Sequence, residues 1–179
     1  HQVAARVGAR HIPVAGALRD LDLAIERTLE PVHPLHACGV VQRDLAMQQE
    51  KLPAQRAHLL DRLIETLDEW LDEDTCHPSL LHGDLWGGNW MTTAGDEPVL
   101  FDPAVYVGCR EADLAMTTLF GGFPQDFYDA YQEVFPFQSG YEERQPLYHL
   151  YYLLCHLNLF GEGYGSAIDD ILRRYVCTW

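Results

Sequence analysis

One short segment, residues 79–102, interrupts a chain whose hydrophobic residues otherwise follow a helical period. Before it, an apolar stripe predicts an amphipathic helix that begins at Pro53 and ends near Asp74. The stripe consists of Leu60, Leu63, Ile64, Leu67 and Leu71. Proline suits the first turn of a helix, because the amide that it lacks would have no partner there. After the segment the helical period returns, so a mainly helical body around one small β element is expected.

Inside the segment, two short strand patterns flank a turn. Residues 90–93 and 99–101 are the candidate strands, and residues 94–98 between them contain the glycine, aspartate and proline that are typical of a turn. The predicted fold class is therefore mainly α with a small β-hairpin (α+β). Further helices are predicted over residues 14–29, 42–50, 111–120, 125–135, 141–160 and 166–175.

The charge balance excludes several classes of partner. Twelve basic against 27 acidic residues give a net charge of −15 over 179 residues, which repels nucleic-acid phosphates and anionic membrane surfaces. No apolar run reaches the roughly 20 residues of a membrane-spanning helix. The five cysteines show no C-x-x-C spacing, which is typical of reduced thiols. We expect a cytoplasmic protein that binds neither nucleic acid nor membranes.

Three oxygen-bearing side chains lie beside the predicted hairpin: Asp84 and Asn89 flank the loop that precedes it, and Asp102 follows its second strand. Phosphoryl transfer needs a carboxylate near the attacking hydroxyl and oxygen ligands for Mg²⁺. Asp84 suits the first role, and Asn89 with Asp102 suits the second. Residues 87–88 are glycines, which allow a tight turn between Asp84 and Asn89. The alternative is a turn-rich loop in which these side chains only cap backbone amides.

The run His82-Gly83-Asp84-Leu85-Trp86-Gly87-Gly88-Asn89 resembles the catalytic loop of the aminoglycoside phosphotransferase and choline kinase superfamily, which are kinase-like small-molecule phosphotransferases. Four later segments resemble, more narrowly, the fructosamine kinase (ketosamine-3-kinase) family. They are DPAVY at 102–106, GCREADLAM at 108–116, LFGGF at 119–123 and HLNLFG at 156–161. The resemblance runs from about residue 41 to residue 175.

This resemblance implies a protein-kinase-like carboxyl-terminal lobe in residues 41–179, and it leaves residues 1–40 as an unassigned helical or loop segment. It implies that Asp84 is the catalytic base for a sugar hydroxyl, and that Asn89 and Asp102 bind Mg²⁺. ATP would be the phosphoryl donor. The acceptor would be a ketosamine, either small or bound to a protein lysine.

Two supporting residues and a cleft residue also follow from the resemblance. His82 would bond nearby backbone, and Asp113 would brace the catalytic loop; the alternative for Asp113 is a first-turn acid favoured by the helix dipole. Trp86 would floor the substrate cleft, since an aromatic face suits a sugar ring, or it only packs. Cys109 stands where the family usually has histidine, so no polar role is expected there.

An ATP site of this kind also needs an amino-terminal lobe with a glycine-rich loop and a strand lysine. Upstream of His82 the glycines are isolated, and Lys51 is the only lysine, so the lobe is expected to be absent. A non-catalytic truncated lobe or binding module is therefore the alternative to a ketosamine kinase. Phosphorylation of an aminoglycoside or choline-like alcohol is a further alternative. Apolar surface near Trp86 and Trp90 is expected to favour self-association.

Three other groups of side chains have either a structural or a functional interpretation. Residues 33–38 contain nitrogen and sulfur donors that suit zinc, or they form a solvated loop. His149 and His156 are expected to be core or cleft-lining residues. Arg110 and Arg144 pair either with an acidic substrate or with surface carboxylates.

Overall fold

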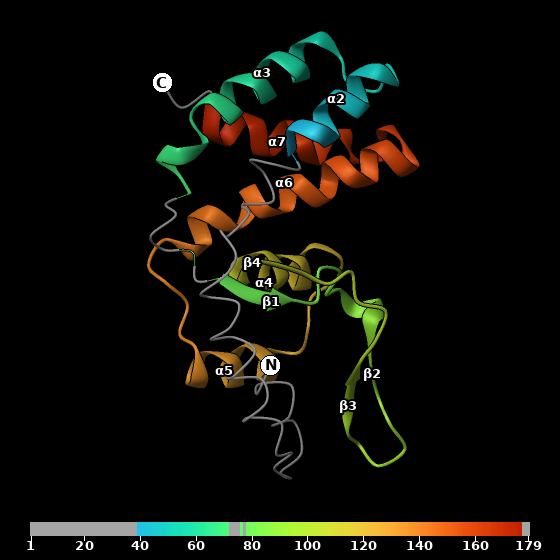
Figure 1. The fold of residues 1–179 in the computed structure, drawn as a ribbon, viewed down its shortest axis with the longest axis vertical. Coiled ribbons are helices and arrows are strands. Elements are labelled where there is room, and N and C mark those ends of the chain that lie inside the picture. The colour runs from blue at the N-terminus through green and yellow to red at the C-terminus, as the bar shows by residue number, and fades with distance from the viewer. Residues whose placement is uncertain (1–38, 72–75, 77, 177–179) are drawn as a thin grey trace. The chain divides into compact units, whose positions relative to one another are not determined.

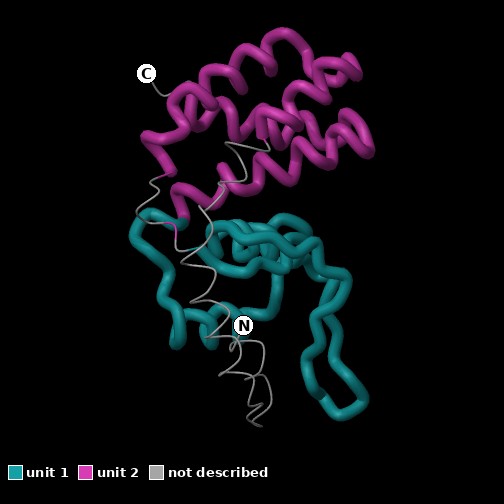
Figure 2. Tube along the Cα trace, in the orientation of Figure 1, with its two compact units in different colours: residues 1–31, 77–141 teal, residues 32–76, 142–179 magenta. Residues whose placement is uncertain are grey.

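The computed structural model describes residues 39–71, 76 and 78–176 (Figure 1). The helix predicted over residues 14–29 and the zinc candidate at residues 33–38 lie outside the described residues. The chain divides into two compact units (Figure 2). Of the described residues, one unit contains 78–141 and the other contains 39–71, 76 and 142–176.

The unit that contains residues 39–71 is built from helices. They are α2 (Val40–Gln48), α3 (Ala54–Glu65), η3 (Leu67–Glu69), α6 (Tyr141–Phe160, whose first residue belongs to the other unit), η6 (Glu162–Tyr164) and α7 (Gly165–Val176). Helix α3 packs along α7. The predicted stripe supplies Leu60 and Leu63 to the core, where Ile168 and Leu172 of α7 are also fully buried. Amphipathic periodicity therefore identified the face that forms this core.

The helix predicted from Pro53 to Asp74 is too long, because α3 ends at Glu65. Thr66 leaves the helical conformation, and its hydroxyl donates toward the carbonyl oxygens of Arg62 at 3.2 Å and Leu63 at 3.4 Å. Such bonds from a threonine side chain compete with continuation of the helix. The short helix η3 then returns Leu67 to the core.

The unit that contains residues 78–141 has two small antiparallel sheets. Its elements are β1 (Pro78–Leu81), η5 (Gly87–Asn89), β2 (Trp90–Thr92), β3 (Pro98–Leu100), β4 (Tyr106–Cys109), α4 (Arg110–Leu119) and α5 (Gln125–Val134). Strands β2 and β3 pair with Trp90 opposite Leu100, which confirms the predicted hairpin. Strands β1 and β4 also pair, and neither was predicted as a strand.

Helix α4 follows β4 without a loop, since Cys109 is both the last residue of β4 and the N-cap of α4. Most of α4 is buried, and it contacts β1. The mainly helical fold with a small hairpin is thus confirmed. Among the helices of the described residues, none combines the length and the apolar character needed to cross a membrane.

Candidate active site

The loop from His82 to Asn89 joins β1 to β2 and crosses close to the chain that follows Asp102. The amide of Ala104 donates to the carbonyl oxygen of His82 at 2.8 Å. Gly83 has a φ of +82°, and a Cβ there would lie 1.9 Å from the carbonyl oxygen of Ala104. Only glycine combines this conformation with so close a backbone approach. The crossing sets the loop against the segment that carries Asp102.

Asp113 lies in the first turn of α4 and is buried. Its Oδ2 accepts the amide of His82 at 2.6 Å, and its Oδ1 accepts the amide of Gly83 at 2.9 Å. Hydrogen bonds to an ionised carboxylate are stronger than neutral ones. The carboxylate therefore holds two consecutive amides at the start of the loop.

The His82 ring lies between the loop and the end of the hairpin. Its Nε2 is 3.0 Å from the carbonyl oxygen of Phe101, and its Nδ1 is 3.4 Å from the amide nitrogen of Asp84. Because a carbonyl only accepts and an amide only donates, these contacts assign Nε2 as the donor to Phe101 and Nδ1 as the acceptor from Asp84. His82 thus links Asp84 to the residue that precedes Asp102.

Asn89 is buried, and its side chain points at Asp84. Its Nδ2 donates to Oδ2 and to the carbonyl oxygen of Asp84, each at 2.8 Å, and lies 3.5 Å from the carbonyl oxygen of Asp102. The two bonds to Asp84 use both hydrogens of the amide nitrogen. Oδ1 is then the atom of Asn89 that is suited to a cation.

Asp102 is exposed and has a φ of +55°. A non-glycine residue with positive φ is uncommon and is found most often at turns and functional sites. The structure brings Asp84, Asn89 and the backbone of Asp102 into direct contact, and it places the Asp102 side chain at the adjoining end of β3. Oxygen donors of an amide and a carboxylate are ligands that Mg²⁺ accepts, together with phosphate and water. Within the described residues, no cluster of three or more histidine, cysteine, aspartate or glutamate side chains is suited to a metal.

Trp86 is 38% exposed, and its ring lies over the backbone of Gly88. A Cβ at Gly88 would come within 2.3 Å of Cζ2 of the indole. Trp86 therefore packs against η5, the turn that ends at Asn89, and keeps part of its ring exposed.

The hairpin carries an apolar face that was not predicted from the sequence. Met91 and Val99 are a cross-strand pair, and they are 56% and 38% exposed. Phe101 follows Val99 by two residues, which places it on the same face, and it is also exposed. In the sequence, the signal for this face was that Val99 and Phe101 are apolar residues two positions apart, as on one side of a strand. This surface, the hairpin face, adjoins Asn89 and Asp102 in the chain.

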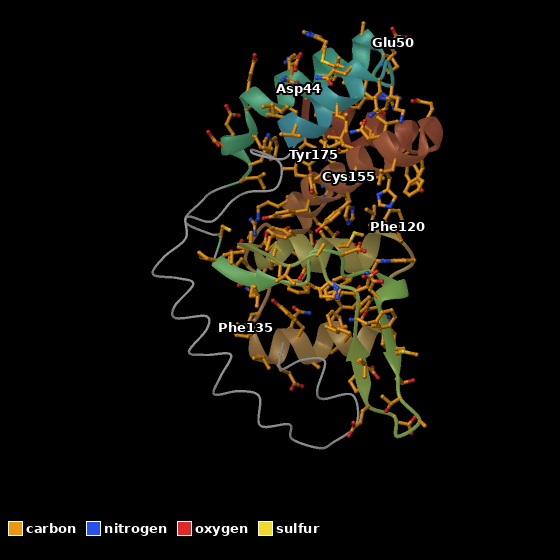
Figure 3. All side chains as sticks on the ribbon, turned by 45° about the vertical axis from the view of Figure 1, so that its right-hand side comes forward. Asp44, Glu50, Phe120, Phe135, Cys155 and Tyr175 are labelled. Atoms are coloured by element: carbon orange, nitrogen blue, oxygen red, sulfur yellow. The ribbon has the colours of Figure 1, made fainter. Side chains whose placement is uncertain are left out.

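Arg110 and His156 have structural contacts. Arg110 donates to Tyr131 Oη at 3.1 Å and to the carbonyl oxygens of Phe135 at 3.1 Å and Pro136 at 2.8 Å. These groups are neutral, unlike the acidic partners expected for Arg110, and they hold the end of α5, where Phe135 lies (Figure 3). His156 Nδ1 lies 2.8 Å from the carbonyl oxygen of Tyr152, and its ring packs against Tyr164.

Comparison with known proteins gave concordant results. Residues 40–178 match the family model described as fructosamine kinase. A protein of Lactiplantibacillus plantarum, provisionally named a ketoamine kinase, is 60% identical over 101 residues, which are 56% of this chain and 36% of that protein. The chloroplastic protein-ribulosamine 3-kinase of Arabidopsis thaliana is 46% identical over 123 residues, which are 66% of this chain and 36% of that protein.

A solved structure extends the likeness from sequence to fold. The crystal structure of a Thermobifida fusca protein, provisionally named a fructosamine-3-kinase, superposes with a TM-score of 0.68 at 38% identity. The superposition covers 74% of this chain and 46% of that one. The chain spans less than half the length of each of these three relatives.

Proposed function

The chain belongs to the fructosamine kinase family, and from that premise we propose that it carries the catalytic loop of an ATP-dependent ketosamine kinase. The observation that carries the proposal is the contact of Asn89 Nδ2 with Asp84 Oδ2 at 2.8 Å, beside the backbone of Asp102. The family match covers residues 40–178, which supports the proposal that residues 41–179 form a kinase-like lobe.

Asp84 is proposed as the general base. Asn89 holds one of its carboxylate oxygens, so the other is the atom for the hydroxyl of the acceptor sugar. As the hydroxyl oxygen bonds to the γ-phosphorus of ATP, its proton passes to Asp84, and the bond to the leaving ADP oxygen breaks. Catalysis of this kind depends mainly on positioning and charge. The bonds from Asp113 to the loop amides and from His82 to Phe101 supply that positioning in the proposal.

Asn89 and Asp102 are proposed as the residues that hold Mg²⁺. When bound, Mg²⁺ neutralises charge on the phosphates during transfer. The donor set fits this ion, because it consists of a carboxylate and an amide oxygen and leaves positions for phosphate and water. Holding Nδ2 of Asn89 on Asp84 fixes which atom of the amide is presented to the cation.

The hairpin face of Met91, Val99 and Phe101 is proposed as the surface for the adenine ring. A planar base gains free energy by covering exposed apolar side chains, and this face adjoins the proposed metal ligands. The exposed part of the Trp86 ring is proposed as a platform for the acceptor sugar. Its packing on Gly88 is compatible with that role.

A ketosamine is the proposed acceptor because of the family and of the relatives' names, which specify a ketoamine and a protein-bound ribulosamine. A net charge of −15 favours an amine or a lysine-rich protein over an anionic acceptor. The second candidate is a non-catalytic lobe or binding module.

The test is transfer of labelled phosphate from ATP to a small ribulosamine or fructosamine. The chain is assayed alone and joined to the part of a relative that it does not match. We expect Asp84→Asn to lower the rate of the active form by about 10²–10⁴-fold, the usual contribution of a general base. Asp96→Asn, at the exposed hairpin turn, is the control and should retain the rate.

Three outcomes decide between the candidates. A rate unchanged by Asp84→Asn removes Asp84 from the role of base. Turnover by the joined protein but not by the chain alone favours the non-catalytic lobe for this chain. Phosphorylation of an aminoglycoside or choline, but of no ketosamine, contradicts the proposed acceptor.

A further inference from the structure

Helix α4 carries two buried residues one turn apart that face the same side of the helix, Asp113 and Thr117. Asp113 holds the amides of His82 and Gly83, at the first end of the loop. Thr117 starts a second set of contacts, through Tyr128 of α5. These contacts lead to the other end of the same loop.

The hydroxyl of Tyr128 joins α4 to the segment that precedes α5. It lies 3.0 Å from Thr117 Oγ1 and accepts the amide of Phe123 at 3.1 Å. The hydroxyl of Thr117 donates to the carbonyl oxygen of Leu114 at 2.6 Å, which uses its single hydrogen. Tyr128 therefore donates to Thr117 and accepts from Phe123, so both functions of this one hydroxyl are in use.

The hydrogen bond from the Phe123 amide to Tyr128 matters because the two preceding residues are glycines with no side chain to pack. Gly121 and Gly122 both have positive φ, at +106° and +74°, and both are exposed. A Cβ at either position would meet no atom within 4 Å. Side-chain packing therefore does not hold these two residues, and the hydrogen bond from the Phe123 amide to the Tyr128 hydroxyl follows them directly.

The Phe123 ring contacts the first residue of β2. Its centroid lies 5.5 Å from that of Trp90, and on its other side it packs edge-on against Phe127 at 4.9 Å. Trp90 follows Asn89 directly, and the carbonyl oxygen of Asn89 accepts the amide of Phe101 at 3.1 Å. The contact between the Phe123 and Trp90 rings thus helps to fix the backbone next to Asn89, at the second end of the loop.

We infer that Tyr128 is a positioning residue, whose hydroxyl fixes Phe123 against Trp90 and thereby holds the Asn89 amide in register with Asp84. This inference deepens the proposed function and rests on it for the role of Asn89. One helix, α4, then fixes both ends of the loop from His82 to Asn89, directly through Asp113 and indirectly through Thr117. Displacement of a positioned group by about 1 Å is enough to weaken catalysis strongly.

The chain has only two asparagines, Asn89 and Asn158, which makes the test direct. In the 179-residue chain labelled with ¹⁵N-asparagine, the side chains give two NH₂ pairs, assigned with Asn158→Asp. Tyr128→Phe should shift or broaden the Asn89 pair and leave the Asn158 pair in place. Tyr131→Phe is the matched control, because it removes a hydroxyl of the same helix that is bonded to Arg110 instead.

A second readout separates positioning from general loosening. Mn²⁺ alone serves as the probe, by paramagnetic broadening of the Asn89 pair. Its affinity should fall about 10-fold in Tyr128→Phe, the lower end of the range for groups that orient metal ligands. Tyr131→Phe should leave the affinity unchanged even where its unfolding midpoint falls equally. Phe123→Leu keeps the hydrogen bond from the backbone amide of residue 123 to Tyr128 but removes the ring contact with Trp90. It should reproduce both effects of Tyr128→Phe.

The inference fails if the Asn89 pair is unmoved in Tyr128→Phe, or if the two tyrosine variants affect it alike. An Asn89 pair that moves without a loss of Mn²⁺ affinity also overturns it. A wild-type chain in which Mn²⁺ broadens neither pair contradicts the proposed metal role of Asn89, and with it the functional half of the inference. The coupling of Tyr128 to Asn89 is still decided in that case by the first readout.

Discussion

Gly83 and Gly87 lie in the same loop, yet only one of them has no room for a side chain. Gly83 has a positive φ, and a Cβ there would lie 1.9 Å from the carbonyl oxygen of Ala104, whereas a Cβ at Gly87 would meet no atom within 4 Å. The sequence, which has glycine at both positions, does not distinguish the two. The difference arises because the chain returns across the start of the loop after Asp102, where the amide of Ala104 donates to the carbonyl oxygen of His82.

Gly83→Ala should therefore destabilise the protein, and Gly87→Ala should be tolerated. The strained backbone alone costs about 1–3 kcal/mol, and the clash with a backbone oxygen adds to it. The measurement is the free energy of unfolding in urea for both variants. Equal free energies for the two alanine variants would show that the loop does not cross the chain at Ala104.

Asp113→Asn tests the brace at the start of the loop. An amide offers one acceptor oxygen where the carboxylate offers two, so either His82 or Gly83 loses its partner. A loss of about 1–3 kcal/mol is expected for a buried unsatisfied amide.

The control for this variant is Asp126→Asn, in the first turn of α5, which removes only a favourable interaction with the helix dipole of about 0.3–1 kcal/mol. Urea unfolding again supplies the numbers. Similar losses in both variants would support the dipole interpretation of Asp113 instead of the brace.

Motif spacing led to Asp84, Asn89 and Asp102 because these residues lie within one short stretch of chain. Tyr128 and Phe123 carry no comparable signal. Their link to Asn89 runs through α4 and through a ring contact that only the folded chain creates. The roles of all these residues remain predictions.

At the scale of elements, local pattern predicted what local contacts form. The β2–β3 hairpin joins neighbouring segments through a turn, and its strands were predicted nearly to the residue. Strands β1 and β4 pair with each other although the loop from His82 to Asn89 and the hairpin separate them in the sequence. Their short apolar runs have no turn between them to indicate pairing, so periodicity alone does not reveal this sheet.

The helical elements of the other unit are joined by a buried arginine. Arg56 of α3 is 5% exposed and contacts both oxygens of Glu162 in η6, at 2.7 and 2.9 Å. It also contacts both oxygens of Asp169 in α7, at 2.8 and 3.0 Å. Hydrogen bonds from Arg56 lower the pKa of Glu162 and of Asp169 below their ordinary values.

Lowered carboxylate pKa values stabilise the fold at pH above the ordinary values, and that stability is lost as the pH falls through the lowered ones. Arg56→Met should cost about 1–2 kcal/mol at pH 7, a modest value because Glu162 is largely exposed. The difference in unfolding free energy between wild type and Arg56→Met should persist down to about pH 5. It should shrink as the pH falls below about 4, through the lowered pKa values.

Urea unfolding across this pH range measures the gap. Arg62→Met, on the exposed side of α3, should show no such gap at any pH. A gap that is constant down to the lowest pH would mean that Arg56 stabilises by packing rather than by pairing with the carboxylates.

At the scale of the whole molecule, two features oppose each other. A net charge of −15 makes copies of the chain repel, whereas the hairpin face leaves three large apolar side chains exposed. Charge repulsion is screened beyond about 10 Å at 0.1 M salt, and apolar contact is not. Composition alone reports the first feature, and only the register of the hairpin reveals the second.

Self-association should therefore increase with salt and depend on the hairpin face. In sedimentation velocity, the dimer fraction is expected to rise between low salt and 0.5 M NaCl, because the Debye length falls to about 4 Å. Met91→Ser with Val99→Ser keeps the net charge and should leave the chain monomeric. Leu159→Ser, at an apolar residue of the other unit that is more exposed than Met91 or Val99, should not. ATP should lower the dimer fraction if adenine covers the same face. A monomer at every salt concentration would contradict self-association. Dimers lost only in Leu159→Ser would place the self-association surface outside the hairpin face.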